Sequence, residues 1–175
     1  MLVVTFSTAG PTALVPRSYA IYPGWEAGPL HLLTAGIHLN VRVTGYGLSG
    51  LLALMTGAYV VALATARRLS LRWIVVVVVA LHLILLMSPP LQLTDLFNYM
   101  GYARLGGLHH LNPYRHVIAE ELHDPIYAFT TWRHLHSPYG PLFTAFSYVL
   151  GPLPLPVMYW LLKALTVAAS LGFLG

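Results

Sequence analysis

The sequence predicts an all-α protein: a polytopic integral membrane helical bundle with a long extracytoplasmic loop that contains short interfacial helices. Of its 175 residues, 57% are hydrophobic and only 8% are charged, against about 25% charged in an ordinary soluble domain. Long stretches carry no charge at all, and most acids and histidines gather in one segment between them. The chain has no cysteine, which excludes a disulfide scaffold and a thiolate nucleophile or metal ligand.

The charge pattern indicates a membrane and argues against nucleic acid. The formal net charge is +4 and the mean hydropathy is +0.70. The nine Lys and Arg residues are scattered singly or lie beside an apolar span, which is typical of membrane topology. We therefore expect membrane lipid among the partners, and no nucleic acid.

Residues 1–45 form an N-terminal segment, which we interpret as the end of a truncated helix followed by an extracytoplasmic loop. The first part is apolar, but it contains Pro11 and has no basic start, unlike a signal peptide. The rest mixes aromatic residues with Gly, Pro and His. Because residue 175 also falls in an apolar run, we expect the chain to be an N-terminal fragment of a larger polytopic protein.

Residues 46–90 are predicted to form a transmembrane helical hairpin. Stretches 46–66 and 73–90 carry no charge, and each is close to the roughly 20 residues that cross a bilayer core. The valine run within the second favours a strand in water, but in lipid only a helix satisfies its own backbone hydrogen bonds. Arg67, Arg68 and Arg72 lie between the stretches without an acid, which places this turn in the cytoplasm.

Alternation then makes residues 91–138 an extracytoplasmic loop, and residues 139–175 return to the membrane as a pair of transmembrane helices. The loop holds four of the five acids and six of the nine histidines in the chain. We therefore expect a multi-pass protein of the cell membrane whose polar chemistry lies on the outer side.

Asp95 lies just past the second span, where helical spacing resumes. Tyr99 and Tyr102 follow it at i+4 and i+7, on the same face. An isolated carboxylate at the membrane boundary is costly unless it is used or paired. Two interpretations stay open, because Thr94 or Asp95 can cap the helix that follows, or Asp95 can be catalytic, and one carboxylate can do both.

Two proline corners frame the rest of the loop. The sequence Asn-Pro-Tyr at 112–114 follows Gly-Gly at 106–107, and together they are expected to end the helix. The sequence Ser-Pro-Tyr-Gly-Pro at 137–141 lies where the loop re-enters the membrane. Rigid corners suit a lipid-linked substrate, although such corners also occur wherever a loop meets a bilayer.

The order of these motifs resembles the GT-C glycosyltransferases over residues 88–163. It runs S-P-P, T-D-x-F-x-Y, a Gly-rich helix end, N-P-Y, a tryptophan and S-P-Y-G-P-L. Within that family it is similar to the bacterial polyprenol-phosphate-mannose-dependent mannosyltransferases. The resemblance implies transfer of a hexose, mannose in those enzymes, from a polyprenyl-phosphate sugar to an extracytoplasmic glycan or glycolipid acceptor. It also places Asp95 at the position of the catalytic aspartate.

The implied reaction needs one base, which takes a proton from the acceptor hydroxyl while C1 is attacked from the opposite face. Asp95 in that role predicts inversion. We expect polyprenyl-phosphate mannose as the donor and assign no other cofactor. No metal is assigned either, because Asp95 lacks the neighbouring acid that many GT-C enzymes have. Candidate substrate-binding residues are Tyr99, Arg104, Asn112, Tyr114, Arg115, Arg133, His136 and Tyr139. Solvent or headgroup contact for the arginines, and interfacial packing for the tyrosines, stay open as alternatives.

Two other functions also stay open. A metal-dependent membrane enzyme would use the histidines of the loop, although their spacing matches no standard ligand pattern: His109, His110, His116, His123, His134 and His136. A non-catalytic membrane assembly or transport subunit would need no base. Transporters, however, place their charges near the midplane, and here the only charge in the predicted spans is Lys163, expected toward the cytoplasmic end of the last helix.

Overall fold

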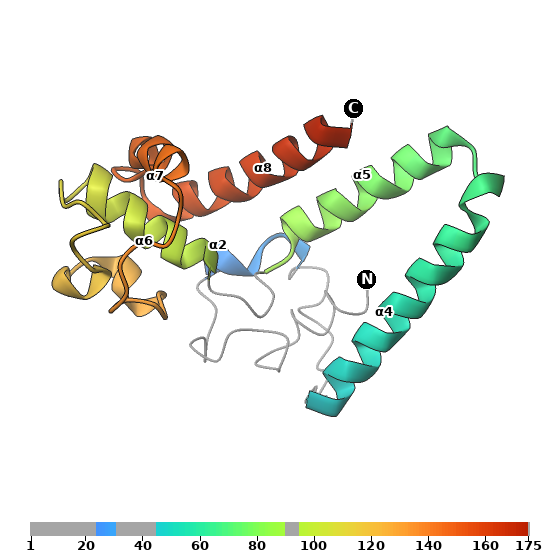
Figure 1. Ribbon diagram of the computed structural model, residues 1–175, viewed down its shortest axis with the longest axis horizontal. Helices are drawn as coiled ribbons and strands as arrows, with labels where there is room; N and C mark the ends of the chain where they lie inside the picture. The colour runs from blue at the N-terminus through green and yellow to red at the C-terminus, as the bar shows by residue number, and fades with distance from the viewer. Residues whose placement is uncertain (1–23, 31–44, 90–94, 175) are drawn as a thin grey trace. The chain divides into compact units, whose positions relative to one another are not determined.

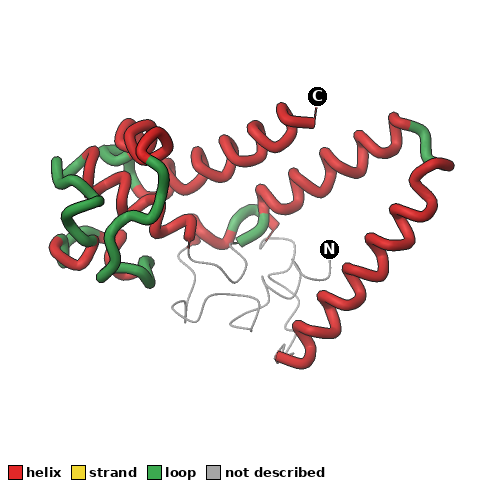
Figure 2. The backbone as a smooth tube through the Cα atoms, in the orientation of Figure 1, coloured by secondary structure: helices red, strands yellow, loops and turns green. Residues whose placement is uncertain are grey.

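The computed structural model describes residues 24–30, 45–89 and 95–174, and in these ranges the regular structure is helical with no strand (Figure 2). The all-α prediction is therefore confirmed for the described part of the chain. The chain divides into two units, Met1–Gln92 with Val167–Gly175, and Leu93–Thr166.

The first unit contains two long helices (Figure 1). Helix α4 spans Gly45–Thr65, the 3-10 turn η1 spans Ala66–Arg68, and helix α5 spans Leu71–Met87. These two helices cover the residues for which a transmembrane hairpin is predicted. Of the predicted N-terminal segment, only residues 24–30 are described, and they include the short helix α2 (Gly24–Ala27).

Many apolar side chains of α4 and α5 are exposed at the surface. Tyr59, Val61 and Leu63 are 62–66% exposed on α4, and Leu71 and Trp73 are 63–76% exposed on α5. An apolar surface this continuous is what lipid covers in membrane proteins. It supports a membrane location for both helices.

Two helical segments are long and apolar enough to cross a membrane, Ser49–Arg68 with 20 residues and Leu155–Phe173 with 19. Helix α5 has 17 residues, at the lower limit for a span. These lengths point to membrane association, and the polytopic arrangement stays a prediction.

The second unit is built around helix α6 (Asp95–Gly107), whose Phe97, Met100, Tyr102 and Leu105 are at most 2% exposed. Around it lie short elements: η2 (Ile118–Glu120), η3 (Pro125–Ala128), α7 (Pro141–Ser147), η4 (Tyr148–Leu150) and the first part of α8 (Leu155–Leu174). Phe97 stacks on Phe129 and on Tyr159, with ring centroids 5.6 and 6.0 Å away. An aromatic core thus joins α6 to η3 and to α8.

The pair of helices predicted for residues 139–175 differs from expectation in its first member. Helix α7 and turn η4 together form the segment Pro141–Leu150, whose ten residues rise about 15 Å. That is half of a bilayer core about 30 Å thick, so α7 is too short to cross as one helix. Pro141 starts α7, and the glycine and prolines at 151–154 end the segment before α8 begins.

Helix α6 ends at Gly107, as the Gly-Gly pair predicts, and the turn that follows contains a non-glycine residue with left-handed backbone. The residue with left-handed backbone is His110, with φ of 59°, and the Leu111 N–H donates across the turn to the Leu105 carbonyl at 2.9 Å. Gly106 and Gly107 are the last two residues of the helix, and a Cβ added there would meet the ring and the backbone of Tyr148. The glycines therefore allow α6 to pack closely on η4, and the turn depends on His110.

Candidate active site

Asp95 is the first residue of α6 and is partly buried. A carboxylate in the first turn interacts favourably with the positive end of the helix dipole, although a helix that begins at Asp95 puts the N-cap position at residue 94. Thr94, the other capping candidate, lies outside the described residues. Asn98, Tyr99 and Tyr102 follow Asp95 at i+3, i+4 and i+7 and share its face of the helix.

Four aromatic side chains gather beside Asp95, and we name Tyr99, Tyr102, Tyr139 and Phe143 the aromatic cluster. The Tyr139 ring lies 4.4 Å from Tyr99 and 5.8 Å from Tyr102, centroid to centroid. Phe143 on α7 lies 5.1 Å from Tyr99 and 6.3 Å from Tyr139. Two residues predicted for the site, Tyr99 and Tyr139, are thus brought together although they are far apart in sequence.

The environment of Tyr139 keeps its phenol protonated. Burial, followed by the charges of Tyr99 and Asp95, raises the pKa of Tyr139 above its ordinary value of 10.0. The hydroxyl therefore stays an O–H donor at physiological pH. The Tyr139 hydroxyl is buried and has no hydrogen-bond partner among the described residues.

Residues 132–139, which we name the covering segment, lie along the Asp95 face of α6. The Trp132 N–H donates to Oδ1 of Asn98 at 3.3 Å, and the Tyr102 hydroxyl donates to the Leu135 carbonyl at 2.8 Å. Both contacts use backbone groups of the segment and side chains of α6. They fix the path that leads the chain to Tyr139.

Asn98 is 0% exposed, and its Nδ2 has no hydrogen-bond partner among the described residues. The bond from Trp132 fixes which end of the carboxamide is the oxygen, since a flipped amide would lose that acceptor. A buried donor left unpaired costs about 1–3 kcal/mol. The favourable contribution of this side chain is therefore the bond that Oδ1 makes to the covering segment.

The two proline corners contact each other. The Tyr114 hydroxyl lies 2.7 Å from the Tyr139 carbonyl oxygen, and the Ser137 N–H donates to the Pro113 carbonyl at 2.8 Å. Asn112 closes its own corner, because its Oδ1 accepts the Tyr114 N–H at 2.9 Å. In the structure, Asn112 and Tyr114 support the corner that carries Tyr139.

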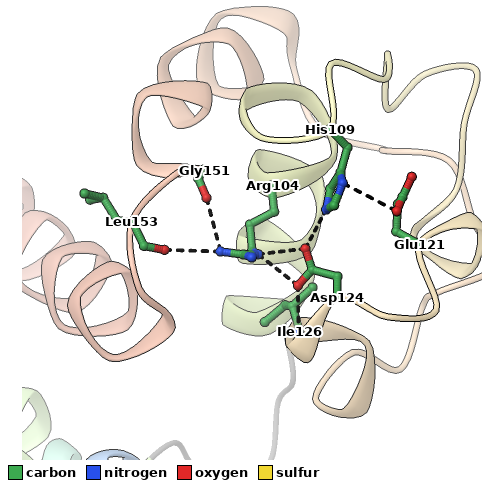
Figure 3. A network of polar contacts seen from close by, with 7 residues as sticks. All are labelled: Arg104, His109, Glu121, Asp124, Ile126, Gly151 and Leu153. Carbon is green, nitrogen blue, oxygen red and sulfur yellow. Dashed lines mark hydrogen bonds and ion pairs between the residues drawn. The ribbon is translucent and has the colours of Figure 1, made fainter.

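Arg104 belongs to a buried polar network (Figure 3). Its Nε lies 2.9 Å from both carboxylate oxygens of Asp124, and its Nη1 donates to the carbonyls of Gly151 and Leu153 at 3.2 Å each. The Asp124 side chain is 0% exposed and that of Arg104 is 11% exposed. This arginine therefore fastens α6 to the turn before α8, and its predicted contact with substrate stays a prediction.

Asp124 receives further donors in the same network. His109 Nε2 lies 2.6 Å from Oδ2, and the Ile126 N–H donates to Oδ1 at 3.0 Å. Burial alone would raise the pKa of Asp124, but the bonds from His109, Ile126 and Arg104 outweigh burial and lower that pKa. The carboxylate is thus held ionised inside the loop, and it organises the residues around it.

The remaining basic candidates lie at the surface of the same unit. Arg133 is on the covering segment, with its guanidinium 4.5 Å from the centre of the Tyr127 ring. His136 is exposed on the same segment, and Arg115 is exposed beside the Asn112 corner. Of these three, Arg133 and His136 share a segment with Tyr139, whereas no described contact joins Arg115 to the aromatic cluster.

Sequence reasoning missed three structural partners, Asn98, His109 and Asp124. Asn98 lies at i+3 from Asp95 on a helix with an aromatic face, a signal that the sequence does contain. His109 and Asp124 meet across a loop without periodicity, so no spacing rule identifies the pair.

The histidines of the loop are the candidate ligands for a metal ion. Over the described ranges, no group of three or more His, Asp or Glu side chains is arranged to hold a metal ion. Two of the histidines pair with acids instead, His109 with Asp124 and His116 with Glu120, whose Oε2 lies 2.8 Å from His116 Nδ1.

Comparison with known proteins adds one finding. A family described as alpha-(1->6)-mannopyranosyltransferase, N-terminal domain (MptA_B family), matches residues 1–173. No curated protein and no solved structure matches the chain.

Proposed function

The chain belongs to the alpha-(1->6)-mannopyranosyltransferase family through its N-terminal domain, and from this membership we propose that it is the acid-bearing part of a membrane mannosyltransferase. The enzyme is of the GT-C type and multi-pass. It transfers mannose from a polyprenyl-phosphate donor to an extracytoplasmic glycan or glycolipid acceptor, with inversion.

The observation that carries this proposal is the place of Asp95. It is a partly buried carboxylate at the start of a helix, beside an aromatic cluster that includes the half-buried rings of Tyr99 and Tyr139. Aromatic rings pack well on the apolar faces of sugars, and their hydroxyls add polar contacts. A carboxylate next to such rings has the surroundings that a sugar-transferring base needs.

In the proposed reaction, the acceptor hydroxyl oxygen attacks C1 of the donor sugar from the face opposite the phosphate. Asp95 takes the hydroxyl proton as the new C–O bond forms. The bond between C1 and the phosphate oxygen breaks, and polyprenyl phosphate leaves with the electron pair. One attack of this kind inverts C1.

The departing phosphate needs positive charge and hydrogen-bond donors. Arg133 and His136 are the favoured candidates, because they lie on the same covering segment as Tyr139 and neither is held by an acid in the buried network. Arg115 is the next candidate. Arg104 is the least favoured of the predicted arginines, because Asp124 already holds it.

Membrane placement is part of the proposal. The exposed apolar surfaces of α4 and α5 support a lipid environment, and the basic turn Ala66–Arg68 between them favours the cytoplasmic side. The unit that starts at α6 would then face the outside, where a lipid-linked sugar donor and a growing glycan meet.

The test is Asp95→Asn in the full-length parent protein, assayed in membranes with radiolabelled polyprenyl-phosphate mannose and its glycolipid acceptor. The amide keeps the size of the carboxylate but cannot take the proton, so we expect mannose transfer to fall by at least about 100-fold. Glu121→Gln, the same change at a partly exposed acid of the loop, is the control and should retain transfer. Transfer at the wild-type rate by Asp95→Asn, with matched expression, would remove Asp95 from the mechanism.

A further inference from the structure

The covering segment reaches the aromatic cluster by way of two side chains of α6. Asn98 accepts the Trp132 N–H through Oδ1, and Tyr102 donates its hydroxyl to the Leu135 carbonyl. Both side chains lie within seven residues of Asp95 and share its helix face. One buried helix therefore carries the acid and also holds the segment that ends in Tyr139.

We propose that Asn98 and Tyr102 are positioning residues of the mannosyltransferase, which hold the covering segment so that the Tyr139 side chain stays packed on the face of α6 that carries Asp95. This inference rests on the proposed function. Neither residue needs to touch the sugar, because each acts through the segment that it holds.

The chemistry of the contacts fits positioning. Asn98 and Tyr102 bind backbone atoms of the segment, so they fix its path independently of its side chains. They are 0% and 1% exposed and belong to the core of the unit, which makes them rigid supports. Burial also raises the pKa of the Tyr102 phenol above its ordinary value of 10.0, so the hydroxyl that donates to the segment is even harder to deprotonate than an exposed one.

Tyr139 is the group that these contacts place. Its ring packs on Tyr99 and Tyr102, its carbonyl accepts from Tyr114, and its phenol is protonated. Because this hydroxyl has no hydrogen-bond partner among the described residues, it can donate to a substrate that binds on the Asp95 face of α6. Small misplacements of such groups have large kinetic effects, since a shift of about 1 Å can slow a reaction by roughly 100-fold.

The experiment is a double-mutant cycle in the full-length protein in membranes. Tyr102→Phe removes one hydroxyl and keeps the ring, and Tyr139→Phe does the same at the residue being placed. We expect each single variant to lower kcat by about tenfold or more while KM changes by less than about twofold. If Tyr102 acts through Tyr139, the double variant should be no slower than Tyr139→Phe alone.

Asn98→Ala is the second arm, because it removes the acceptor of the Trp132 N–H without adding bulk. It should reproduce the kcat loss of Tyr102→Phe, and the loss should again vanish in the Tyr139→Phe background. The matched control is Tyr59→Phe on α4, the same loss of a hydroxyl at a residue 66% exposed, and it should keep wild-type kcat. Rates are normalised to folded protein, measured as the monodisperse fraction after detergent extraction.

Wild-type kcat in Tyr102→Phe and Asn98→Ala, or losses that multiply with that of Tyr139→Phe, would overturn the positioning role. A fall in folded protein without a fall in kcat per folded molecule would overturn it as well. Full transfer by Asp95→Asn would instead overturn the proposed function. Loss of transfer by Asp95→Asn with unchanged kcat in Tyr102→Phe and Asn98→Ala would remove this inference alone.

Discussion

The sequence predicts that the guanidinium of Arg104 binds substrate. In the structure it pairs with the buried carboxylate of Asp124 instead. Replacing Arg104 by methionine, of similar reach, should lower the free energy of unfolding by roughly 3–5 kcal/mol, because Asp124 would stay buried with its strongest charge partner removed. Arg115→Met is the control, since an exposed arginine should change stability by less than about 0.5 kcal/mol. The measurement is the melting temperature of the purified full-length protein in detergent, and equal values for the two variants would contradict this role of Arg104.

The lowered pKa of Asp124 predicts acid sensitivity. The stabilisation from its bonds is fully present above the ordinary carboxyl pKa of 3.8 and is lost as the pH falls through the lower folded value. The melting temperature should therefore drop below about pH 4. Asp124→Asn should melt lower at neutral pH and respond less to acid, so an undiminished acid response in that variant would assign the effect to other groups.

His110 holds the left-handed position at the end of α6, with φ of 59°. Glycine adopts this conformation without a Cβ clash, so His110→Gly should stabilise the protein by about 0.5–1 kcal/mol. His123→Gly, at an exposed residue with ordinary backbone, should not stabilise it. Thermal melts of both variants test this, and a lower melting temperature for His110→Gly would show that the imidazole has a role of its own.

The close contact between α6 and the η4 turn depends on glycines, which have no Cβ atom. An added Cβ at Gly107 would meet the Tyr148 backbone, and one at Gly151 would lie 2.6 Å from the Ala103 carbonyl oxygen. Gly107→Ala should therefore force the two elements apart and destabilise the protein by about 1–3 kcal/mol. Gly140→Ala has nothing within 4 Å and should cost less, so melting temperatures in the reverse order would contradict this packing.

The elements that the sequence predicted are those with a strong local signal. Long uncharged runs predicted α4 and α5, and the i+4 spacing placed Asp95 and Tyr99 on one face of α6. The apolar run from residue 139 predicts a transmembrane helix, but α7 and η4 together span only Pro141–Leu150, which is too short to cross a bilayer. The Arg104–Asp124 pair depends on a loop path that only tertiary packing sets, so no local pattern could predict it.

At the scale of the whole molecule, membrane sidedness decides whether the proposed chemistry is possible. A lipid-linked sugar and an extracytoplasmic acceptor require the Asp95 unit to lie on the extracytoplasmic side of the membrane. The basic turn at Ala66–Arg68 favours the cytoplasmic side. Positive charge in a short loop is a strong determinant of orientation. The two requirements are consistent with each other only if α5 crosses the bilayer.

Cysteine labelling tests this directly, because the 175-residue chain contains no cysteine and an introduced one is unique within it. Ser70→Cys lies next to the basic turn, and Leu122→Cys is 62% exposed in the unit that carries Asp95. The cells express the full-length protein with any other cysteines replaced. In intact cells, a membrane-impermeant maleimide should label position 122, and it should label position 70 only after the cells are permeabilised. Labelling of both positions from the same side would mean that α5 does not cross, and a base at Asp95 would then never meet an extracytoplasmic acceptor.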